Sequence, residues 1–501
     1  MRFFEMLLFF SSACLLAFSF IVNQHIRRSA LLLTSGTGSI FLLIHLLFEG
    51  YRVQLVFLYG FTLLMLILSL MDAFKTPAVV QTASRIRTVL GRLFIGFGLI
   101  ATGCFLYVFP VFNVPEPTGE LKVSTQVFHF IDSSREETFG TTATGKRELM
   151  VQVWYPAQAG SGKYAPFIPD TRILRYMAAN YGLPGFTFQH LKYVSSHAYS
   201  GAEVSSAQNS YPLILGNPGF GSSRFLHTSQ AENLASHGYI VAVIDHTFNT
   251  FATEFPDGRI TTSTTNDLFS PDHDYRTESG NRDKLGKVLT DDVAFVLDQF
   301  ELIQSGQISS RFKGKIDLKH VGVFGHSIGG ATAYDAAFDP RITAGIDLDG
   351  GLYRLHDREG LQKPFLFIHS ESEYERFKMV RDDRVYTDAE LDRMGSTREW
   401  MDQVTEDKKL ELKRMRETVG EGGQVLYIDN AEHWNFTDVQ FISPIFKILG
   451  ITGKISPERA STVINAYMLD FFDMHLKNQG GNLMKGPDSR FPEMKFATSL
   501  L

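Results

Sequence analysis

Four apolar segments within the first 112 residues constrain this 501-residue chain more than any other feature. Each has about 17–20 residues, roughly the length that a helix needs to cross about 30 Å of hydrocarbon. Buried core helices are the alternative, but four nearly uncharged runs in so short a stretch are not typical of a soluble core. The sequence therefore predicts a transmembrane region of four helices, at about residues 6–22, 30–48, 53–71 and 93–112.

Basic residues are distributed unevenly between the loops that join these segments. Six of them lie in the first and third loops, at Arg27, Arg28, Lys75, Arg85, Arg87 and Arg92. Only Arg2 and Arg52 lie on the other side. By the positive-inside rule the richer loops face the cytoplasm, so everything after residue 112 is expected outside the cell. Residues 113–120, which include two prolines, then form a short linker.

Charge and cysteine content exclude several classes of function. Residues 1–112 carry a net charge of +5, so the remainder of the chain carries −11. An acidic domain of this kind argues against nucleic acid as a partner. The two cysteines, Cys14 and Cys104, both lie in the apolar region, so the rest of the chain has no thiol nucleophile and no cysteine metal site. We expect no metal and no other cofactor.

Beyond the linker, strand and helix patterns alternate. Two stretches, at residues 123–132 and 148–157, alternate apolar and polar residues, as half-buried antiparallel strands do. Six later runs are continuously apolar, which is typical of strands buried on both faces: residues 212–217, 239–245, 320–325, 344–349, 364–370 and 424–429. Helical patterns separate them at about residues 228–237, 289–303, 329–338 and 457–476. This order predicts an α/β domain with a mostly parallel sheet over residues 121–480, before a tail at 481–501.

A highly charged helical pattern interrupts the predicted sheet between its last two strands. This insert comprises residues 371–423. A solvated helix is one interpretation of so much charge. A lid over a binding site is the other, because the insert falls between two strands of the sheet.

The stretch Gly325-His326-Ser327-Ile328-Gly329 lies where a strand pattern gives way to a helix pattern. A turn this tight forces its central residue into a strained backbone conformation, and the flanking glycines leave room for the strand and the helix. The hydroxyl is then presented at the end of the sheet and at a helix N-terminus, where developing negative charge is favoured. We therefore predict that Ser327 is a nucleophile.

A nucleophilic serine needs a base that is held by an acid. In this type of turn the chain order is serine, acid, histidine. His433 follows the last predicted sheet strand, where the base belongs, and His356 and His369 are alternatives. The side chain of His326 is expected to point away from the hydroxyl and to have a packing role.

Spacing alone leaves two candidate positions for the acid. Asp347 and Asp349 lie in the predicted strand that follows the helix after Ser327, called here the elbow helix. Successive strand residues face opposite sides. Asp349 lies at the end of that strand, where a loop can turn it toward the histidine. Glu371 or Glu373, after the next strand, is an equally good candidate.

Two backbone N–H groups are needed to stabilise the oxyanion. One is expected from Ile328, the residue after the nucleophile. The other is expected from the loop Pro218-Gly219-Phe220-Gly221, because its glycines let the backbone face the reacting carbonyl. An ordinary glycine turn is the alternative interpretation of that loop.

Five stretches together resemble the platelet-activating-factor acetylhydrolase family, the serine-dependent group II phospholipases: PLILGNPGFGSSR, LASHGYIVAVIDH, GHSIGGATA, GIDLDGG and AEHWNF. The resemblance covers about residues 121–480 and implies an α/β-hydrolase fold with the acid on the strand after the elbow helix. It therefore assigns Ser327 as nucleophile, Asp349 as acid and His433 as base. It also implies that the amides of Phe220 and Ile328 are the oxyanion donors and that no metal is needed.

Three departures from the family concern the substrate rather than the reaction. Pro218 stands where a histidine is usual, Gly350-Gly351 follows the acid where an aromatic residue is common, and the family's secreted enzymes lack the apolar region. We expect a membrane-anchored serine ester hydrolase that acts on short-acyl or phospholipid-type esters. A general carboxylesterase, lipase or polyester hydrolase of the same fold is the alternative, and a non-catalytic membrane receptor is a third.

Overall fold

The computed structural model describes residues 2–74, 85–140, 145–158, 162–269, 273–420, 422–497 and 500. They form two compact units. The helical unit comprises residues 1–112, 184–194 and 442–445, and the sheet unit comprises the rest of the chain. Lys75, on which the predicted orientation partly rests, lies outside the described residues, as do position 421 of the insert and positions 498, 499 and 501 of the tail.

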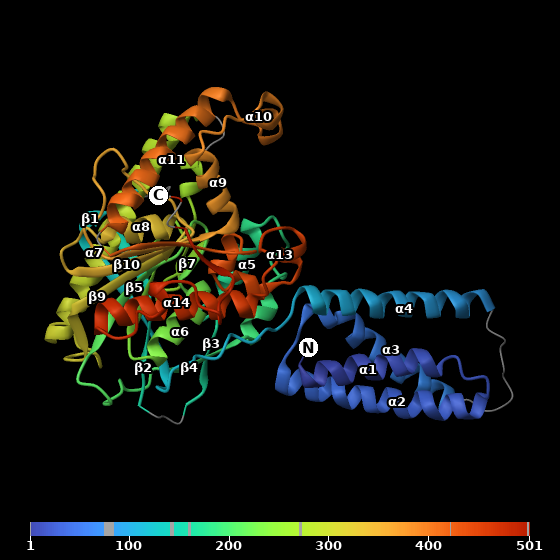
Figure 1. Ribbon diagram of the computed structural model, residues 1–501. Helices are drawn as coiled ribbons and strands as arrows, with labels where there is room; N and C mark the ends of the chain where they lie inside the picture. The colour runs from blue at the N-terminus through green and yellow to red at the C-terminus, as the bar shows by residue number, and fades with distance from the viewer. Residues whose placement is uncertain are drawn as a thin grey trace. The chain divides into compact units, whose positions relative to one another are not determined.

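The described residues of the sheet unit form an 11-stranded sheet (Figure 1). In order across the sheet its strands are β13 (Met494–Phe496), β12 (Gln424–Ile428), β11 (Phe365–Ser370), β10 (Ile342–Leu348), β9 (Ile316–His326), β5 (Tyr211–Asn217), β6 (Ile240–Asp245), β2 (Lys146–Pro156), β1 (Val123–Glu136), β4 (Ser195–Ser200) and β3 (Tyr164–Pro166). Strands β12 through β6 run parallel, whereas β2 pairs antiparallel with β1 and β6. The predicted α/β class with a mostly parallel sheet is confirmed. A separate ribbon pairs β7 (Ala252–Glu254) with β8 (Ile260–Thr262).

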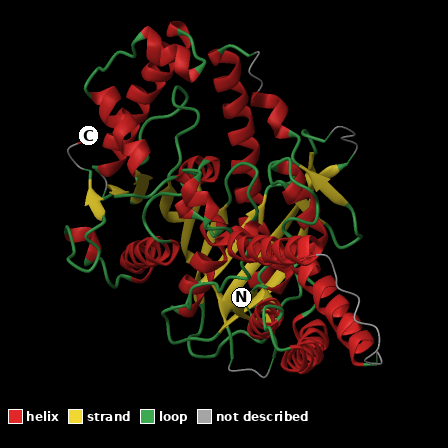
Figure 2. Cartoon of the chain, turned by 90° about the vertical axis from the view of Figure 1, so that its right-hand side faces the viewer, coloured by secondary structure: helices red, strands yellow, loops and turns green. Residues whose placement is uncertain are grey.

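Helices cover both faces of the sheet (Figures 1 and 2), and successive residues of the central strands pack into different cores. Leu213 and Leu215 of β5 join a core with α7 (Tyr275–Ser305) and α8 (Ile328–Ala336). Ile214, between them, joins a second core with α6 (Thr228–Ser236) and α14 (Pro457–Lys477). Full burial of one such side chain contributes about 1.5–3 kcal/mol. Because both faces are covered, these strands are continuous apolar runs in the sequence.

The predicted helices α6, α8 and α14 begin and end within two residues of their expected bounds. Helix α7 instead begins 14 residues before the expected residue 289. The Asp274 side chain accepts a hydrogen bond from the N–H of Thr277 at 2.7 Å, which caps a polar first turn that hydrophobic periodicity does not reveal. The other α-helices described after residue 112 are α5 (Leu174–Asn180), α9 (Glu371–Arg381), α10 (Asp388–Met394), α11 (Arg398–Val419), α12 (Val439–Ile442) and α13 (Ile445–Ile448).

The helical unit contains α1 (Phe3–Phe18), α2 (Gln24–Ile44), α3 (Val56–Ala73) and α4 (Arg85–Val108). Helix α2 begins six residues earlier than expected because the Asn23 side chain accepts hydrogen bonds from the backbone of His25 and Ile26. A π-helical turn, His45–Glu49, extends its end. Helix α4 ends before Pro110 rather than at residue 112, because proline and the residue before it disfavour helix.

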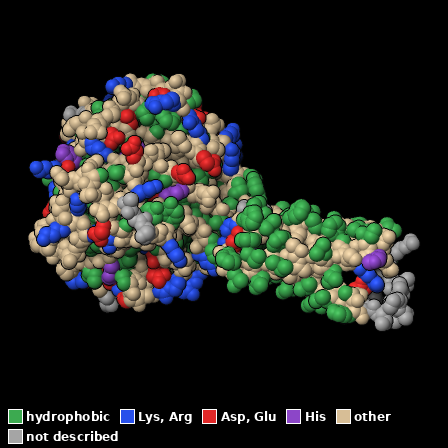
Figure 3. Space-filling view, turned by 90° about the horizontal axis from the view of Figure 1, so that it is seen from below, with side chains coloured by type: hydrophobic (Ala, Val, Ile, Leu, Met, Phe, Trp, Pro, Cys, Tyr) green, Lys and Arg blue, Asp and Glu red, His purple; other side chains and the backbone are tan. Residues whose placement is uncertain are grey.

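Three helices among the described residues are long and apolar enough to cross a membrane: Gln24–Glu49, Val53–Ala73 and Thr88–Val108. Helix α1 has 16 residues and is therefore about 24 Å long, short of the roughly 30 Å of a bilayer core. The prediction of four spanning helices is wrong for α1, because this helix ends at Phe18 although the apolar run continues to Val22. Hydrophobic side chains cover much of the visible surface of the helical unit (Figure 3).

A buried ion pair joins the start of α1 to the loop before α3. The Nη1 atom of Arg52 lies 2.8 and 3.0 Å from the two carboxylate oxygens of Glu5. Its Nη2 atom donates to the carbonyl oxygen of Phe109 at 2.6 Å, just beyond α4. Both charged side chains are almost completely buried. Removing only one partner of such a pair is strongly destabilising, because the remaining charge stays buried.

Replacing Glu5 by leucine leaves the Arg52 guanidinium without its carboxylate. We expect the free energy of unfolding to fall by about 3–5 kcal/mol, measured by chemical denaturation in a nonionic detergent. The double variant Glu5→Leu/Arg52→Leu removes both charges and should be more stable than the single variant. A double variant no more stable than Glu5→Leu would show that the two side chains are not coupled.

Candidate active site

Ser327 lies in the turn between β9 and α8 with φ 57° and ψ −126°, a conformation that residues other than glycine rarely adopt. A Cβ atom at Gly325 would overlap the carbonyl oxygen of Gly329, and one at Gly329 would overlap the carbonyl oxygen of Asn217. Only glycine fits at either position because the backbones approach so closely. The half-buried Ser327 side chain is thereby held at the N-terminus of α8.

Asp349 and His433 are joined by a short hydrogen bond. Asp349 follows β10 with a positive φ of 56°, and its Oδ1 atom accepts a hydrogen bond from the N–H of Ser370 at 2.6 Å. Its Oδ2 atom lies 2.7 Å from Nδ1 of His433. The aspartate side chain is 3% exposed and the histidine side chain 40% exposed. A carboxylate at Nδ1 keeps the ring proton there and leaves Nε2 able to accept another proton.

Backbone contacts bring Ser327 to the same place. Its N–H donates to the carbonyl oxygen of Leu348, the last residue of β10, at 3.0 Å. A Cβ atom at Gly350 would overlap the Ser327 carbonyl oxygen. The His433 ring centroid lies 4.5 Å from that of His326, the residue before the serine. The three loops that carry the residues predicted as nucleophile, acid and base therefore lie next to one another.

His326 connects the loop that carries His433 to the nucleophile turn. Its Nε2 atom lies 2.9 Å from the backbone carbonyl oxygen of His433, and a Cβ atom at Gly219 would lie 3.0 Å from its Nδ1 atom. Burial, with smaller contributions from His433 and His227, lowers the pKa of His326 well below its usual value. The neutral ring donates from Nε2. We expected only packing here, and adjacency to Ser327 was the one signal in the sequence.

The other acids considered from the sequence point elsewhere. The Asp347 carboxyl lies against Gly330 and Gly350, and its Oδ1 atom accepts the N–H of Gly350 at 2.8 Å. Burial raises the pKa of Asp347 well above its usual value, which favours the neutral carboxyl. Glu371 accepts a backbone hydrogen bond from the turn after β12 at 2.8 Å. Burial opposes ionisation of Glu373, but the charges of Lys408 and Arg376 and the hydrogen bond from Lys408 together outweigh it and lower the pKa of Glu373 to about 2.

The two alternative histidines are not bonded to Asp349 in the described part of the chain. His369 is buried within β11 and has no hydrogen-bond partner among the described residues. Its ring packs 5.2 Å from that of Phe377. The His356 side chain is 74% exposed, and its Nε2 atom lies 3.3 Å from Asp407. Neither has the geometry of His433.

Two unpaired backbone amides lie beside the nucleophile turn. The N–H groups of Phe220 and Ile328 donate no hydrogen bond to any residue that the structure describes. A Cβ atom at Gly219 would lie 3.1 Å from the Cβ atom of Ser327, so the loop 218–221 is in contact with the turn. The Phe220 ring packs edge-on against Phe269 at 5.4 Å. Free N–H groups next to a serine hydroxyl are suited to stabilising an oxyanion.

The insert 371–423 packs one face of α11 against the loop that follows Asp349, while its other face is solvated. The buried residues of α11 are Glu411, Leu412, Met415 and Thr418. Lys408 Nζ lies 2.8 Å from a carboxylate oxygen of Glu373 and from one of Glu411. Glu411 in turn accepts the N–H of Leu352 at 3.1 Å. Charged side chains therefore link α9, α11 and the loop beside the acid.

The loop that carries His433 is held at its far end by Asp438, which is completely buried. Asp438 Oδ2 accepts the N–H of Ser229, in the first turn of α6, at 3.0 Å. The Ser229 hydroxyl donates to the other carboxylate oxygen. No lysine or arginine among the described residues pairs with Asp438, and burial raises its pKa to about 7.

We therefore expect stability to fall as pH rises through about 7. The folded-state pKa of Asp438 lies above the unfolded value of about 3.9. The contribution of Asp438 to the free energy of unfolding is therefore fully present below about pH 4, and it is lost as the pH rises through the folded-state pKa. Asp438→Asn keeps an acceptor for Ser229 without a titrating group. Its Tm should decline less than that of the wild type between about pH 5 and pH 9. Parallel declines in the two proteins would contradict this explanation.

Comparisons with known proteins identify a family for this chain. Residues 107–263 and 289–491 match the family described as platelet-activating factor acetylhydrolase, isoform II. The chain is 24% identical over 414 residues to a probable 1-alkyl-2-acetylglycerophosphocholine esterase of Arthroderma benhamiae, covering 77% of this chain and 94% of that protein. It is 25% identical over 379 residues to a platelet-activating factor acetylhydrolase of Cavia porcellus, covering 70% and 79%.

A solved structure with a similar fold is a ferulic acid esterase from Streptomyces cinnamoneus. It matches with a TM-score of 0.59 at 28% sequence identity, over 77% of this chain and 98% of that one. These relatives and this structural neighbour all hydrolyse esters by name, so the chain is an ester hydrolase rather than a non-catalytic receptor. It belongs to the family of platelet-activating factor acetylhydrolase, isoform II.

Proposed function

We propose that this chain is a membrane-anchored serine ester hydrolase in which Ser327 is the nucleophile, His433 the base and Asp349 the acid. The 2.7 Å contact between His433 Nδ1 and Asp349 Oδ2, beside the strained turn, carries the proposal. Nε2 of His433 takes the serine proton as the hydroxyl attacks the ester carbonyl carbon. Asp349 orients the imidazole and stabilises its charged form.

The amides of Phe220 and Ile328 stabilise the oxyanion of the tetrahedral intermediate. His433 then donates its proton to the leaving alcohol, and the acyl group stays on Ser327 Oγ. Water attacks the acyl-enzyme with His433 again as base, which releases the carboxylic acid and restores the serine. Loss of one oxyanion donor typically lowers the rate by about 10²–10³.

Short-acyl or phospholipid-type esters are the substrates that we propose. The names of the relatives support this class, since the Arthroderma protein is a probable 1-alkyl-2-acetylglycerophosphocholine esterase. The apolar helices of the chain support it too, because an anchor keeps an esterase near lipid. A general carboxylesterase activity is the second candidate, favoured by the match to a ferulic acid esterase.

We also propose that the catalytic domain lies outside the cell. Arg85, Arg87 and Arg92 lie in the N-terminal part of α4 and favour a cytoplasmic position for that end of the helix. The chain after α4 would then emerge on the opposite side. This orientation does not depend on whether α1 crosses the membrane, because it follows from the last spanning helix alone.

Replacing Ser327 by alanine should abolish the hydrolysis of every ester tested. In nonionic detergent we expect p-nitrophenyl acetate turnover to fall by at least about 10³-fold, because no other group supplies the acyl-accepting oxygen. Wild-type protein should react with a fluorophosphonate probe and the variant should not. Equal activity of the two proteins would show that the assignment of the nucleophile is wrong. A panel of acetyl, long-chain and phospholipid esters separates the two substrate classes.

The two neighbouring aspartates provide a matched pair of variants. Asp349→Asn should lower kcat by about 10⁴-fold, because an amide cannot hold His433 in the tautomer that accepts the serine proton. Asp347→Asn replaces a carboxyl that burial already keeps neutral, so its kcat should stay within about threefold of the wild type. The assignment of the acid would be overturned if Asp347→Asn were the more damaging change.

A further inference from the structure

Asn217 is the last residue of β5 and comes directly before residues 218–221, called here the oxyanion loop. It is completely buried. Its Nδ2 atom donates to the carbonyl oxygen of Phe324, in the strand that leads into the nucleophile turn, at 3.0 Å. Its own carbonyl oxygen leaves no space for a Cβ atom at Gly329. Asn217 therefore lies where the oxyanion loop meets the turn that carries Ser327.

A completely buried histidine, His246, holds this asparagine. His246 follows β6, and its Nε2 atom lies 3.2 Å from Oδ1 of Asn217. Its Nδ1 atom lies 3.0 Å from a carboxylate oxygen of Asp292, on α7. The amide nitrogen of Asn217 is turned to the Phe324 carbonyl, which can only accept, so the amide oxygen faces His246. Nε2 of His246 therefore donates to Asn217.

Asp292, the partner of the other ring nitrogen, is held as a carboxylate. Arg147, on β2, pairs with it through two nitrogens at 2.6 and 3.0 Å, and Nη2 of Arg135 lies 2.9 Å from it. Burial opposes ionisation of Asp292, but the charge of Arg147 and the hydrogen bonds of His246 and Arg147 outweigh it and lower the pKa of Asp292. Both nitrogens of the His246 ring therefore donate, and rotation of the ring would leave a buried acceptor without its donor.

The far end of the oxyanion loop is held separately, by the main chain. The N–H of Gly221 donates to the carbonyl oxygen of Asn249 at 3.0 Å. Phe220 lies in the sequence between this anchored end and Asn217, so the direction of its N–H depends on both anchors. A side-chain substitution leaves the anchor at Gly221 in place, whereas the anchor at Asn217 depends on the side chain of His246.

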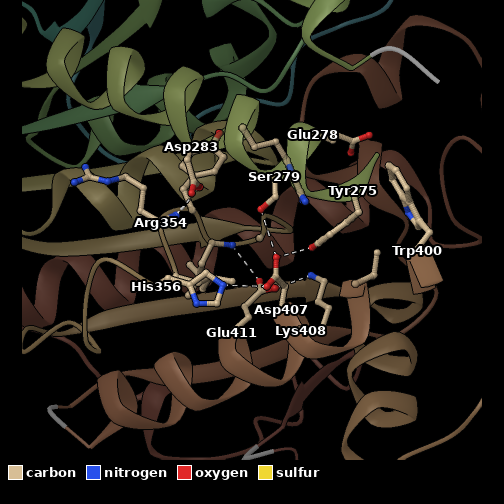
Figure 4. Close-up of a pocket in the computed structure, with 16 residues that line it drawn as sticks. Tyr275, Glu278, Ser279, Asp283, Arg354, His356, Trp400, Asp407, Lys408 and Glu411 are labelled. Carbon is tan, nitrogen blue, oxygen red and sulfur yellow. Dashed lines mark hydrogen bonds and ion pairs between the residues drawn. The ribbon is translucent and has the colours of Figure 1, made fainter. Parts of the chain in front are cut away.

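Helix α7, which carries Asp292, is itself fixed to neighbouring elements. Near its start, the Tyr275 hydroxyl donates to Asp407 of α11 at 2.6 Å (Figure 4). Further along the helix, Asp283 accepts the N–H of Arg354, in the loop that follows the proposed acid, at 2.8 Å (Figure 4). The same helix therefore supports the loop after the acid and, through Asp292, the histidine next to the oxyanion loop.

We propose that His246 is a positioning residue for the oxyanion hole and acts through Asn217 to set the direction of the Phe220 amide. This inference rests on the proposed function, because it concerns the same site. His246 is completely buried, so it acts on the loop and not on the substrate. An amide stabilises an oxyanion only when it is aimed at the position that the oxygen takes in the transition state. The link from Asp292 through His246 to Asn217 fixes that aim before the substrate binds.

Two substitutions of His246 separate its two hydrogen bonds. The amide nitrogen of glutamine replaces Nε2 and can still donate to Asn217, whereas that of asparagine replaces Nδ1 and reaches only Asp292. In the full-length protein in a nonionic detergent, we expect His246→Asn to lower kcat for p-nitrophenyl acetate at least about tenfold, with KM within about twofold. His246→Gln should keep kcat within about threefold of the wild type. A kcat of His246→Gln at or below that of His246→Asn, or an effect on KM alone, would overturn the proposal.

Asn217→Ser tests the same link from its other partner, and it replaces the first test if His246→Asn does not fold. Serine is too short to bridge the His246 ring and the Phe324 carbonyl, so kcat should fall at least about tenfold with little change in KM. Adding His246→Asn to Asn217→Ser should lower kcat by no more than about twofold further, because both changes remove one interaction. Losses that multiply would show that His246 does not act through Asn217.

Hydrogen exchange measures the loop independently of catalysis. In a peptide that covers residues 217–224, we expect amide exchange at least about threefold faster in His246→Asn than in His246→Gln. Equal exchange would overturn the role of His246 toward the loop, and faster exchange with an unchanged kcat would overturn its role toward the reaction. If Ser327→Ala kept full esterase activity, the proposed function would fail while the exchange still decided on the loop.

Discussion

The close backbone contact around Ser327 is the constraint on which the site depends. The turn at Ser327 approaches the end of β5 at Gly329 and the loop after β10 at Gly350 with no side chain between. Each contact fixes one partner of the reaction, because the β5 loop carries Phe220 and the β10 loop carries Asp349. A positive φ at Ser327 costs of the order of 1–3 kcal/mol. The two apolar cores that cover the sheet offset that strain.

Two aspartates that are two residues apart illustrate how the fold separates chemical roles. Simple alternation would place Asp347 and Asp349 on the same side of β10. The positive φ of Asp349 breaks the alternation, so its carboxylate turns to the N–H of Ser370 and to His433. Asp347 stays buried, and only the N–H of Gly350 bonds to it among the described residues. One carboxyl is thus kept for orienting the imidazole while the other supports the loop.

Much of the fold was predictable because it depends on local periodicity. All six buried strands lie where continuous apolar runs predicted them, since burial on both faces leaves a signal in the sequence. The length of α1 was not predictable in this way, because an apolar run continues past the point where the helix ends. The start of α7 was also missed, because its first turns are polar and depend on the Asp274 cap.

The candidate site was harder to predict from the sequence, because tertiary contacts determine its geometry. The order of serine, aspartate and histidine follows from the topology of parallel strands, but spacing alone left Asp349 and the glutamates after β11 equal. The contact of His326 with the His433 carbonyl joins residues 107 positions apart. The hydrogen bond from the Tyr275 hydroxyl to Asp407 joins α7 to α11 across 132 positions. Such long-range pairs leave no periodic pattern in any single segment of the sequence.

The charged insert shows what composition alone leaves open. Its charge density predicts solvation, yet Lys408 and Glu411 are turned inward and paired. A buried ion pair adds little net stability, because desolvation opposes the Coulombic gain. The pair does, however, destabilise every arrangement in which one charged partner is buried without the other. Here the pairing ties α11 to Glu373 and to the N–H of Leu352, three residues from the acid. The charges therefore specify where the helix docks, and so keep the loop that carries Asp349 in one place.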